Sequence, residues 1–588
     1  KCKEVMIPIL CRLFNNIFDS GFYPDNWSKG CIVPIFKKGE MQDLNNYRGI
    51  TLVSCLAKLF TSIINTRLLE WDQRYNIITD AQFGFKPGVG TIDAIFVLQN
   101  LISRTLKNKK RLYCCFVDYT KAFDLIDRSK LWYKLQMEGF GGKLLRIIKS
   151  LYKNVRACVK HKGTFTETFR ISAGVLQGEI LSPLLFSMYL NDFERYFINS
   201  NCTSIELQMI NMFLIMYADD TVLLAESPEG LQDMLNTLHR YTDEWNLSVN
   251  VQKTKIVIFR NGKCVKDNEK WEYNSKYVEV VNQFNYLGML FNYNGKFLST
   301  QKHCAAQGNK AMFSISSKMK DLNFNVETQL NVFDTYVKSV LSYGAEIWGF
   351  HKGQDVEKVH INFCKKVLGV RKNTCNSAVY YEVGRFPLEI FRKQKIFKYW
   401  FKLRNSKNCI LKACYEDMVK NNDIWISNIR KELSILGLAD LYQSTMKESV
   451  ILDIIFNRMC DVFKQKVVND ISNASKCILY KHVVDHFCLQ VYLKKPIHVK
   501  YRKLITRLRL SSHDLKIETG RYDNLTRDCR KCESCNLNVI EDEFHFLLIC
   551  PSLRSLREKY IKKYHSRKPS VHKLYIYYLL RIQITRIF

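Results

Sequence analysis

Two adjacent acids interrupt a strongly apolar stretch of the chain. In FLIMYADDTVLLA (213–225), Asp219 and Asp220 separate two runs that are typical of buried strands. An unpaired buried charge is costly, so a turn that exposes both acids, a basic partner or a bound cation must compensate them. A third acid, Asp118, ends the apolar run RLYCCFVDY (111–119). Carboxylates gathered at strand ends can hold two divalent cations, Mg²⁺ or Mn²⁺, which together assist phosphoryl transfer.

The elements that must position these acids can be predicted from the pattern. The unbroken apolar run 111–119 indicates a strand buried on both faces. The runs on either side of Asp219 and Asp220 indicate a tight hairpin, and LQDMLNTLHRYTDEW (231–245) predicts an amphipathic helix directly after it. Strand and helix patterns alternate to about residue 290, which predicts an α/β fold, and helical patterns dominate beyond it. Because Asp is common in turns, the pair also fits an ordinary exposed hairpin tip.

A second group of residues suited to chemistry lies near the C-terminus. The segment CRKCESCNLNVIEDEFHFLLIC (529–550) combines closely spaced thiols with a His-x4-Cys pair. Four nitrogen and sulfur ligands suit a tetrahedral structural zinc ion. The alternative is that the end of the segment packs in a small helical core, because EFHFLLIC is largely apolar. The candidates for the four ligand positions are Cys529, Cys532, Cys535, His545 and Cys550.

Composition and charge narrow the class of partner. The chain has 588 residues, enough for about three or four domains, and 47% of them are hydrophobic, which excludes a disordered chain. Lys and Arg outnumber Asp and Glu by 89 to 56, giving a net charge of +33. This excess favours a polyanionic partner, most simply nucleic acid, with an acidic membrane surface as the alternative. No run of about 18 apolar residues occurs, so no membrane span is expected.

A basic segment precedes the cysteine-rich one. KKPIHVKYRKLITRLR (494–509) contains no acid, and Tyr501 offers a ring on which a base can stack. We expect this segment to bind nucleic acid through its cations, which are Lys494, Lys495, Lys500, Arg502, Lys503, Arg507 and Arg509. The chain begins with Lys rather than Met and opens directly in a helical pattern, so we expect it to be part of a longer protein.

Between about residues 27 and 290, eight motifs follow one another along the chain. They are NWSKGCIVPIFKKGE, NNYRGITLVSCLAKLF, QFGFKPGVGTIDAIF, FVDYTKAFDLIDRSKLW, GVLQGEILSPLLFSMYLND, MYADDTVLLAES, LSVNVQKTKIVIF and FNYLGMLF. In this order they resemble the reverse transcriptase domain of non-LTR (LINE-type) retrotransposons of the jockey-like kind. Any one motif is weak evidence, whereas all of them in the family's order are specific. Beyond residue 290 the resemblance continues less sharply, for example in LSYGAEIWGF.

The resemblance implies a right-hand polymerase of the α/β class, followed by a mainly helical C-terminal region with a small zinc-binding element. The implied ranges are fingers 1–115, palm 116–290, thumb-like helices 291–400, a helical and basic region 401–528, a zinc-binding element 529–560 and a tail 561–588. The family keeps a similar Cys-Cys-His-Cys element near its C-terminus. This favours Cys532, Cys535, His545 and Cys550 as the zinc ligands, with Cys529 as the rival first ligand.

Catalytic roles carry over by resemblance to individual residues. Asp118 and Asp219 match the shared ligands of the Mg²⁺ ions, and Asp220 lies beside them in a lesser role. The backbone carbonyl of Tyr119 matches one that also contacts metal. Lys253, in NVQKTK, matches a lysine proposed to protonate the departing pyrophosphate, with an ordinary surface lysine as the alternative.

Residues that contact substrate carry over in the same way. Phe123 matches an aromatic ring under the sugar that would collide with a ribose 2′-OH, and plain core packing is the alternative. Gln177 and Gly178 match the segment against the incoming base and template, where Gly permits close backbone approach; the alternative is a turn before a helix. We interpret Asp124 as structural, capping the helix that follows. The residues that match cations around the triphosphate are Lys37 or Lys38 and Arg48.

The implied function is RNA-directed DNA synthesis by a mobile element. Deoxynucleoside triphosphates would be added to a DNA primer 3′-hydroxyl on an RNA template, and in the family that primer is a nick in target DNA. An endonuclease domain upstream of this chain is expected to make the nick. We expect the protein in the nucleus, with a cytoplasmic ribonucleoprotein stage. The alternatives are a catalytically inactive or domesticated RNA-binding derivative, and an enzyme of the group II intron maturase or telomerase type.

Overall fold

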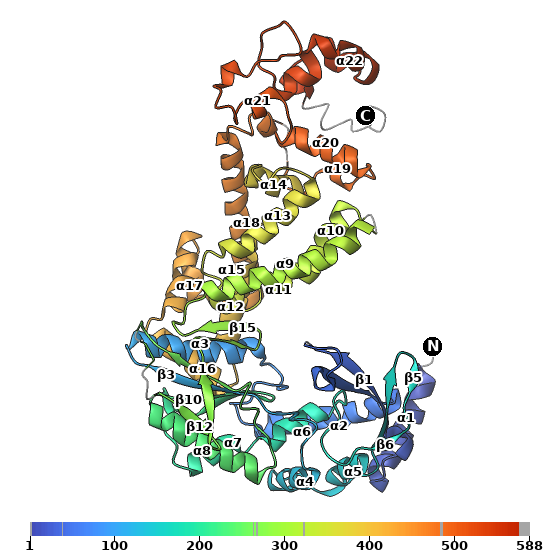
Figure 1. The fold of residues 1–588 in the computed structure, drawn as a ribbon, viewed down its shortest axis with the longest axis vertical. Coiled ribbons are helices and arrows are strands. Elements are labelled where there is room, and N and C mark those ends of the chain that lie inside the picture. Colours follow the sequence, from blue (N-terminus) through green and yellow to red (C-terminus); the bar gives the residue numbers. More distant parts are fainter. Residues whose placement is uncertain are drawn as a thin grey trace. The chain divides into compact units, whose positions relative to one another are not determined.

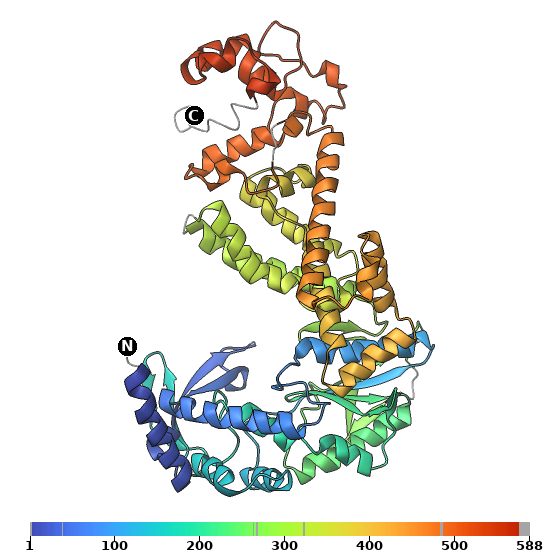
Figure 2. The same cartoon turned by 180° about the vertical axis from the view of Figure 1, so that it is seen from behind.

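The computed structural model describes residues 3–37, 39–262, 264–265, 269–321, 324–482 and 486–574. The chain forms two compact units (Figure 1 and Figure 2). The first contains Lys1–Lys296 and Leu403–Asn421, and the second contains Phe297–Lys402 and Asn422–Phe588. Across the described part of the chain, no helix combines the length and the apolar character needed to cross a membrane.

A six-stranded sheet forms the centre of the first unit. Its strands, in spatial order, are β12 (Trp271–Tyr273), β13 (Lys276–Val280), β11 (Lys255–Phe259), β3 (Leu112–Val117), β10 (Asp220–Ala225) and β9 (Leu214–Tyr217). Every residue of β3 is buried, which confirms the strand predicted over 111–119. Strands β9 and β10 pair antiparallel as the predicted hairpin. The predicted amphipathic helix is α8 (Pro228–Glu244), which packs on β10 and β3, and α3 (Thr91–Lys107) packs on β9 and β3.

A second sheet in the same unit joins segments that are far apart in sequence. It contains β1 (Lys29–Phe36), β2 (Tyr47–Leu52), β4 (Arg156–His161), β5 (Thr164–Phe165) and β6 (Phe169–Arg170). Strand β1 pairs antiparallel with β2 and parallel with β4. Residues 156–170 therefore return to the sheet of residues 29–52, so the ranges expected to form fingers and palm interleave in space.

Helices and short hairpins complete the first unit. The helices are α1 (Lys3–Ser20), α2 (Cys55–Tyr75), α4 (Arg128–Met137), α5 (Gly142–Lys153), α6 (Ser182–Tyr189), α7 (Phe193–Asn199) and α16 (Cys409–Lys420). Two hairpins are formed by β7 (Ile205–Leu207) with β8 (Ile210–Met212), and by β14 (Gln283–Tyr286) with β15 (Met289–Asn292). Helix α16 reaches this unit from much later in the sequence: its N-cap residue Asn408 donates to the Asp80 carbonyl over 3.0 Å. The expected continuous region 401–528 is thus divided between the two units.

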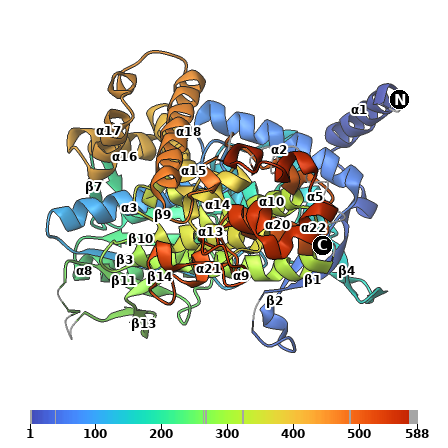
Figure 3. The ribbon, with the colours of Figure 1, turned by 90° about the horizontal axis from the view of Figure 1, so that it is seen from above.

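The second unit is helical, as the periodicity beyond residue 290 predicts (Figure 3). Its longer helices are α9 (Leu298–Asp321), α10 (Val326–Phe333), α13 (Gln354–Leu368), α14 (Asn376–Val383), α15 (Leu388–Arg404), α17 (Ile424–Ile435), α18 (Glu448–Asn473), α20 (Val499–Arg509) and α22 (Arg554–Tyr560). Shorter helices are α11 (Ser339–Leu341), α12 (Ala345–Trp348), α19 (Val491–Lys494), α21 (Lys516–Thr519) and α23 (Lys563–Ser566).

A buried carboxylate ties several of these helices together. Glu382, on α14, is fully buried and accepts hydrogen bonds from Arg509 Nε (2.7 Å), Tyr480 Oη (2.7 Å) and Tyr492 Oη (2.6 Å). Arg509 is itself buried and forms an ion pair with this carboxylate. Both oxygens of the Glu382 carboxylate accept hydrogen bonds in this network, and a satisfied buried network of this kind makes a core rigid.

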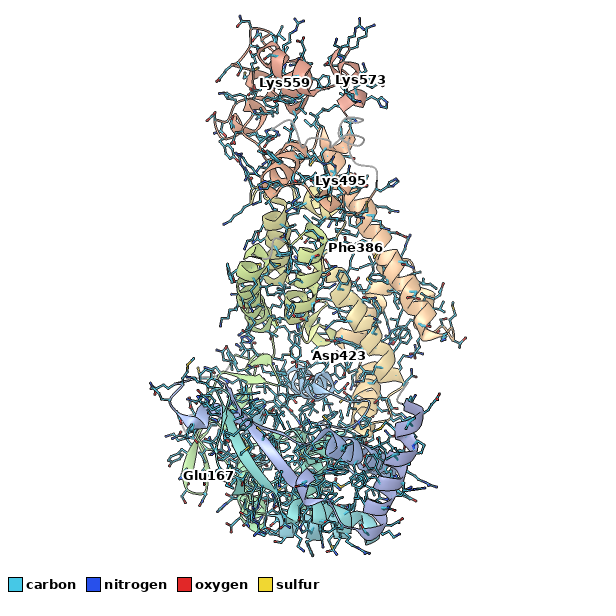
Figure 4. All side chains as sticks on the ribbon, turned by 90° about the vertical axis from the view of Figure 1, so that its right-hand side faces the viewer. Glu167, Phe386, Asp423, Lys495, Lys559 and Lys573 are labelled. Carbon is cyan, nitrogen blue, oxygen red and sulfur yellow. The ribbon has the colours of Figure 1, made fainter. Side chains whose placement is uncertain are left out.

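Part of the predicted nucleic-acid-binding segment 494–509 is therefore core. Arg502 and Arg509 are buried, and Arg507 Nε donates to the Gly369 carbonyl over 2.7 Å, so the expectation that all seven cations bind nucleic acid is wrong. The acid that pairs with Arg509 lies about 130 residues earlier in the chain, so no local pattern reveals it. The exposed cations of the segment include Lys495, labelled in Figure 4.

Removing the buried carboxylate should destabilise the helical unit. Glu382→Ala leaves the Arg509 guanidinium buried without a counter-charge, and such a change costs about 3–5 kcal/mol. We expect the urea concentration at which this unit unfolds to fall accordingly. Hydrogen exchange of its helices, measured at increasing urea concentrations, reports the unfolding. Glu389→Ala is the matched control, because Glu389 is half exposed and pairs with Lys393 within one helix; it should cost less than about 1 kcal/mol. Equal losses in the two variants would contradict the central place of Glu382.

Candidate active site

One cavity in the first unit gathers most of the residues singled out in the sequence. It has a volume of about 750 Å³ and lies between the ends of strands from both sheets. The predicted site residues that line it are Lys37, Arg48, Asp118, Tyr119, Phe123, Gln177, Gly178, Asp219, Asp220 and Lys253. Lys38 lies outside the described residues. Residues spread over more than 200 positions of sequence thus face one space.

The three acids meet at one edge of the central sheet. The antiparallel register of β3 and β10 pairs Val117 with Thr221, so Asp118 and Asp220 follow at the same edge. Burial raises the pKa of the Asp219 carboxyl, and Asp118 adds to this effect. Burial, followed by the charges of Asp219 and Asp118, raises the pKa of Asp220 to about 6. Carboxylates that oppose one another's ionisation in this way favour a bound cation.

The donor set of this edge fits Mg²⁺. Carboxylate oxygens are hard ligands, and Mg²⁺ is usually held by one or two of them together with water and phosphate oxygens. The three acids do not close into a tight trio: within the described ranges, only a Cys/His group near the C-terminus brings three or more such ligand atoms within 4.8 Å of one another. This open arrangement suits a site that substrate oxygens would complete.

The hairpin that carries Asp219 is held by residues that the sequence analysis did not assign. Ala218, at its tip, has a left-handed backbone with φ +55°. The buried Gln82 braces it: its Oε1 accepts from the Ala218 N–H over 2.9 Å and from the Gly84 N–H over 2.8 Å. A Cβ at Gly84 would come within 2.3 Å of the Ala218 nitrogen, so the close approach requires Gly. The sequence signal that could have identified Gln82 and Gly84 is the motif QFGFKPGVGTIDAIF, which contains both residues.

The segment after α8 contacts Asp118 through its backbone and side chains. The Asn250 N–H donates to the Asp118 carbonyl over 2.7 Å, and the Asp118 N–H donates to Thr254 Oγ1 over 3.2 Å. Lys253 Nζ lies 4.0 Å from Asp118 Oδ2, and its side chain is 68% exposed. The predicted lysine therefore stands at the acids with its ammonium group accessible, and its role in proton transfer stays a prediction.

The residues expected to contact the sugar and base line the same cavity. The Phe123 ring stacks on Phe186, with centroids 4.3 Å apart, and it also lines the cavity. Gly178 has φ +109°, and a Cβ there would come within 2.8 Å of the Thr51 carbonyl oxygen. Gln177 Nε2 donates to Asp124 Oδ1 over 3.0 Å.

The interpretation of Asp124 as a helix cap is wrong. The helix begins at Arg128, and its N-cap is Asp127, whose Oδ1 accepts from the backbone N–H of Ser129 (2.8 Å) and Lys130 (3.4 Å). Asp124 instead lines the cavity, and burial raises the pKa of its carboxyl.

The cysteine-rich segment of the second unit forms a compact cluster. The ligand atoms of Cys532, Cys535, His545 and Cys550 all lie within 4.8 Å of one another. Cys535 Sγ and His545 Nε2 are 3.5 Å apart. Cys529 is exposed and stands outside the cluster, where it accepts a hydrogen bond from Thr526 Oγ1. Cys532 rather than Cys529 therefore belongs to the cluster, and three thiols with one imidazole suit a tetrahedral metal ion.

The comparison with known families decides the nature of the first unit. Residues 35–291 match the family model described as reverse transcriptase (RNA-dependent DNA polymerase). The chain contains a reverse transcriptase domain. This confirms the resemblance found in the motifs, and with it a polymerase fold of mixed α/β content. The matched range contains every strand of the central sheet and all the cavity residues named above.

Relatives of the reverse transcriptase domain are proteins of mobile elements. RNA-directed DNA polymerase from mobile element jockey of Drosophila melanogaster is 25% identical over 60% of this chain and 39% of its own length. Probable RNA-directed DNA polymerase from transposon X-element of the same species is 24% identical over 59% of this chain and 38% of its own length. The chain thus spans about two fifths of these relatives. Among solved structures, apo telomerase from Candida tropicalis is 14% identical, with a TM-score of 0.34 over 70% of this chain and 74% of that chain.

Proposed function

We propose that this protein is the RNA-directed DNA polymerase of a mobile element. It would add deoxynucleotides to a DNA primer 3′-hydroxyl on an RNA template, in target-primed retrotransposition. The observation that carries the proposal is the meeting of Asp118, Asp219 and Asp220 with Lys37 and Arg48 in one cavity of a reverse transcriptase domain. Incorporation of dTTP on a poly(rA)/oligo(dT) substrate with Mg²⁺ tests it, and no incorporation with either Mg²⁺ or Mn²⁺ would refute it.

Residues of this chain would divide the chemistry as follows. Asp118, Asp219 and Asp220 would hold Mg²⁺, which when bound activates the primer hydroxyl and neutralises charge on the phosphates. Arg48 suits a forked grip on triphosphate oxygens, and Lys37 adds a point charge. Lys253, with its exposed ammonium beside the acids, would give a proton to the departing pyrophosphate.

Other residues that line the cavity would hold the base pair and the sugar. Gln177 and Gly178 would lie against the incoming base and the template, because the Gly backbone leaves room for a close approach. Phe123 would exclude a ribose 2′-OH. A right-hand division into fingers, palm and thumb is part of the same proposal, with fingers to about residue 115, palm to 290 and helical thumb beyond, and residues 156–170 would join the fingers because they pair with β1.

Shortening Phe123 should relax the choice of sugar. Phe123→Ala removes the ring that faces the cavity, and we expect the kcat/KM ratio of ribonucleotide over deoxynucleotide to rise by at least about tenfold. Phe186→Leu is the control, since it removes the stacking partner and keeps the cavity wall. If Phe123→Ala leaves the ratio unchanged while lowering stability, the ring serves core packing alone.

The alternative is a catalytically inactive RNA-binding derivative of such an element. The intact acids and the Gln82 brace that positions their hairpin favour the enzyme, because an inactive derivative has no need of either. The motifs and the C-terminal cluster also favour the retrotransposon type over a maturase or telomerase type. The RNA template, DNA target, upstream endonuclease domain and nuclear location, with a cytoplasmic ribonucleoprotein stage, are parts of the proposal.

We also propose that the C-terminal cluster binds Zn²⁺ in a structural role. Cys532, Cys535, His545 and Cys550 supply a closed set of four ligands, which leaves no open position for substrate. Between Cys529 and His545 the described chain has little regular structure, with one short backbone pairing between Lys531 and Ile540. Metal binding would therefore contribute much of the folding free energy of this segment.

A further inference from the structure

A second, strongly basic surface lies in the first unit. Two neighbouring cavities of about 580 Å³ and 320 Å³ share Asp25 and Asn154 in their walls. They are formed by the end of α1, the following turn, α4, α5 and strands β1, β4 and β6; α1 packs on α5 (Figure 1). We call this surface the basic cleft. None of its lining residues lines the catalytic cavity.

The charge of the basic cleft is almost entirely of one sign. Asp25 is the one carboxylate among its described lining residues, and it accepts from Asn154 Nδ2 over 3.2 Å. Arg128 belongs to the floor, because its guanidinium donates to the carbonyls of Gly174, Tyr152 and Ile171. The cations that remain exposed to solvent are Lys29, Arg146, Lys149, Lys153, Arg156 and Arg170.

Two of these cations lie directly opposite each other on neighbouring strands, where their like charges repel. Arg156 on β4 and Arg170 on β6 are direct cross-strand partners in an antiparallel pair. Like charges in that position destabilise a sheet. Within the described ranges neither arginine forms an ion pair with a carboxylate; Arg170 Nη2 donates only to the Lys153 carbonyl, over 3.3 Å. An anion bound between the two guanidinium groups would turn this repulsion into attraction.

Exposed aromatic rings accompany the cations. Phe22 lines the larger cavity and is 61% exposed, and Phe169, directly before Arg170, is 44% exposed. Trp132 lines the same cavity, half-buried. Cations that follow a phosphate backbone, beside rings on which bases stack, are the features that bind single strands. A duplex or a free phosphate would leave these rings without a partner.

We propose that the basic cleft binds a single-stranded segment of nucleic acid outside the catalytic cavity. The phosphates lie between Arg156 and Arg170 and along the cations of α5, and a base stacks on Phe22. Single-stranded RNA and single-stranded DNA share this chemistry. The affinities for oligo(rU) and oligo(dT) probes show which of the two the cleft prefers. The inference does not depend on the proposed polymerase activity, because it concerns residues that take no part in the chemistry.

Fluorescence anisotropy on the whole chain tests the proposal. Labelled probes of about twelve nucleotides are titrated with the catalytic cavity already saturated by unlabelled primer–template. We expect Arg156→Gln/Arg170→Gln to weaken binding about tenfold and to reduce the slope of log K against log salt by about 1.4, the value for two phosphate contacts. Phe22→Ala should weaken binding without changing the slope. Primer extension on a short template should be unchanged in both.

The matched control removes two exposed cations elsewhere in the same unit. Lys109→Gln/Lys276→Gln changes the net charge by the same amount, and both lysines are exposed and lie outside the basic cleft. It should alter probe affinity by less than about twofold. The proposal is overturned if the control weakens binding as much as the cleft variant, or if neither Arg156→Gln/Arg170→Gln nor Phe22→Ala changes affinity. Circular dichroism and thermal unfolding verify that the variants are folded.

Discussion

Asp118→Asn and Asp219→Asn should each lower the rate of primer extension by at least about a thousandfold, which corresponds to about 4 kcal/mol of transition-state stabilisation. The substitution keeps the shape of the side chain and removes the charge that holds Mg²⁺. Binding of primer–template should stay within about twofold, because it depends on contacts over a much larger surface. Single-turnover extension and filter binding measure the two quantities separately.

Asp124→Asn is the matched control for this prediction. The same chemical change is made in the same cavity, but Asp124 lies in the turn after β3, and its carboxylate accepts a hydrogen bond from Gln177. Its rate should fall by no more than about tenfold. If the double variant Asp118→Asn/Asp219→Asn extends primers at close to the wild-type rate, these acids are not the metal ligands.

Loss of one ligand from the C-terminal cluster should release its metal and unfold the segment around it. We expect about one zinc ion per chain, falling towards zero in Cys535→Ser and His545→Ala. Because metal binding there contributes folding free energy, hydrogen exchange over 529–560 should become fast in both variants. Elemental analysis of purified protein and exchange measured by mass spectrometry report the two effects. Extension on a primed homopolymer should be unchanged.

Cys529→Ser provides the control for the metal site. This thiol lies three residues before Cys532 but outside the cluster, so its loss should leave both zinc content and exchange unchanged. Zinc retained in Cys532→Ser and lost in Cys529→Ser would reverse the ligand assignment. Wild-type protein that is zinc-free yet equally protected from exchange would mean that these residues are simply packed.

Local patterns were sufficient to predict the elements that carry the acids. The unbroken apolar run 111–119 and the hairpin around Asp219 have the spacing of buried strands, and both form as predicted. The cysteine cluster could also be predicted from the sequence, because its residues lie within about twenty positions of one another. Among its candidates, however, only the folded segment distinguishes Cys532 from Cys529.

What could not be predicted depends on contacts between distant parts of the chain. The Gln82 brace acts on a hairpin about 136 residues later, and Arg509 is buried by a carboxylate about 127 residues earlier. The return of residues 156–170 to the sheet of β1 is likewise a long-range pairing. The burial of Arg502 and Arg509 follows from tertiary packing, which overrides the appearance of a solvent-exposed basic helix.

The most direct test of the account copies a heteropolymeric RNA template from a DNA primer with deoxynucleotides and Mg²⁺, and sequences the product. The wild-type chain should give DNA complementary to the template, and Asp118→Asn/Asp219→Asn should give none above the background of a protein-free reaction. Complementary DNA from the double variant, or wild-type protein that binds the primed template yet extends it with neither Mg²⁺ nor Mn²⁺, would contradict RNA-directed DNA synthesis at this cavity.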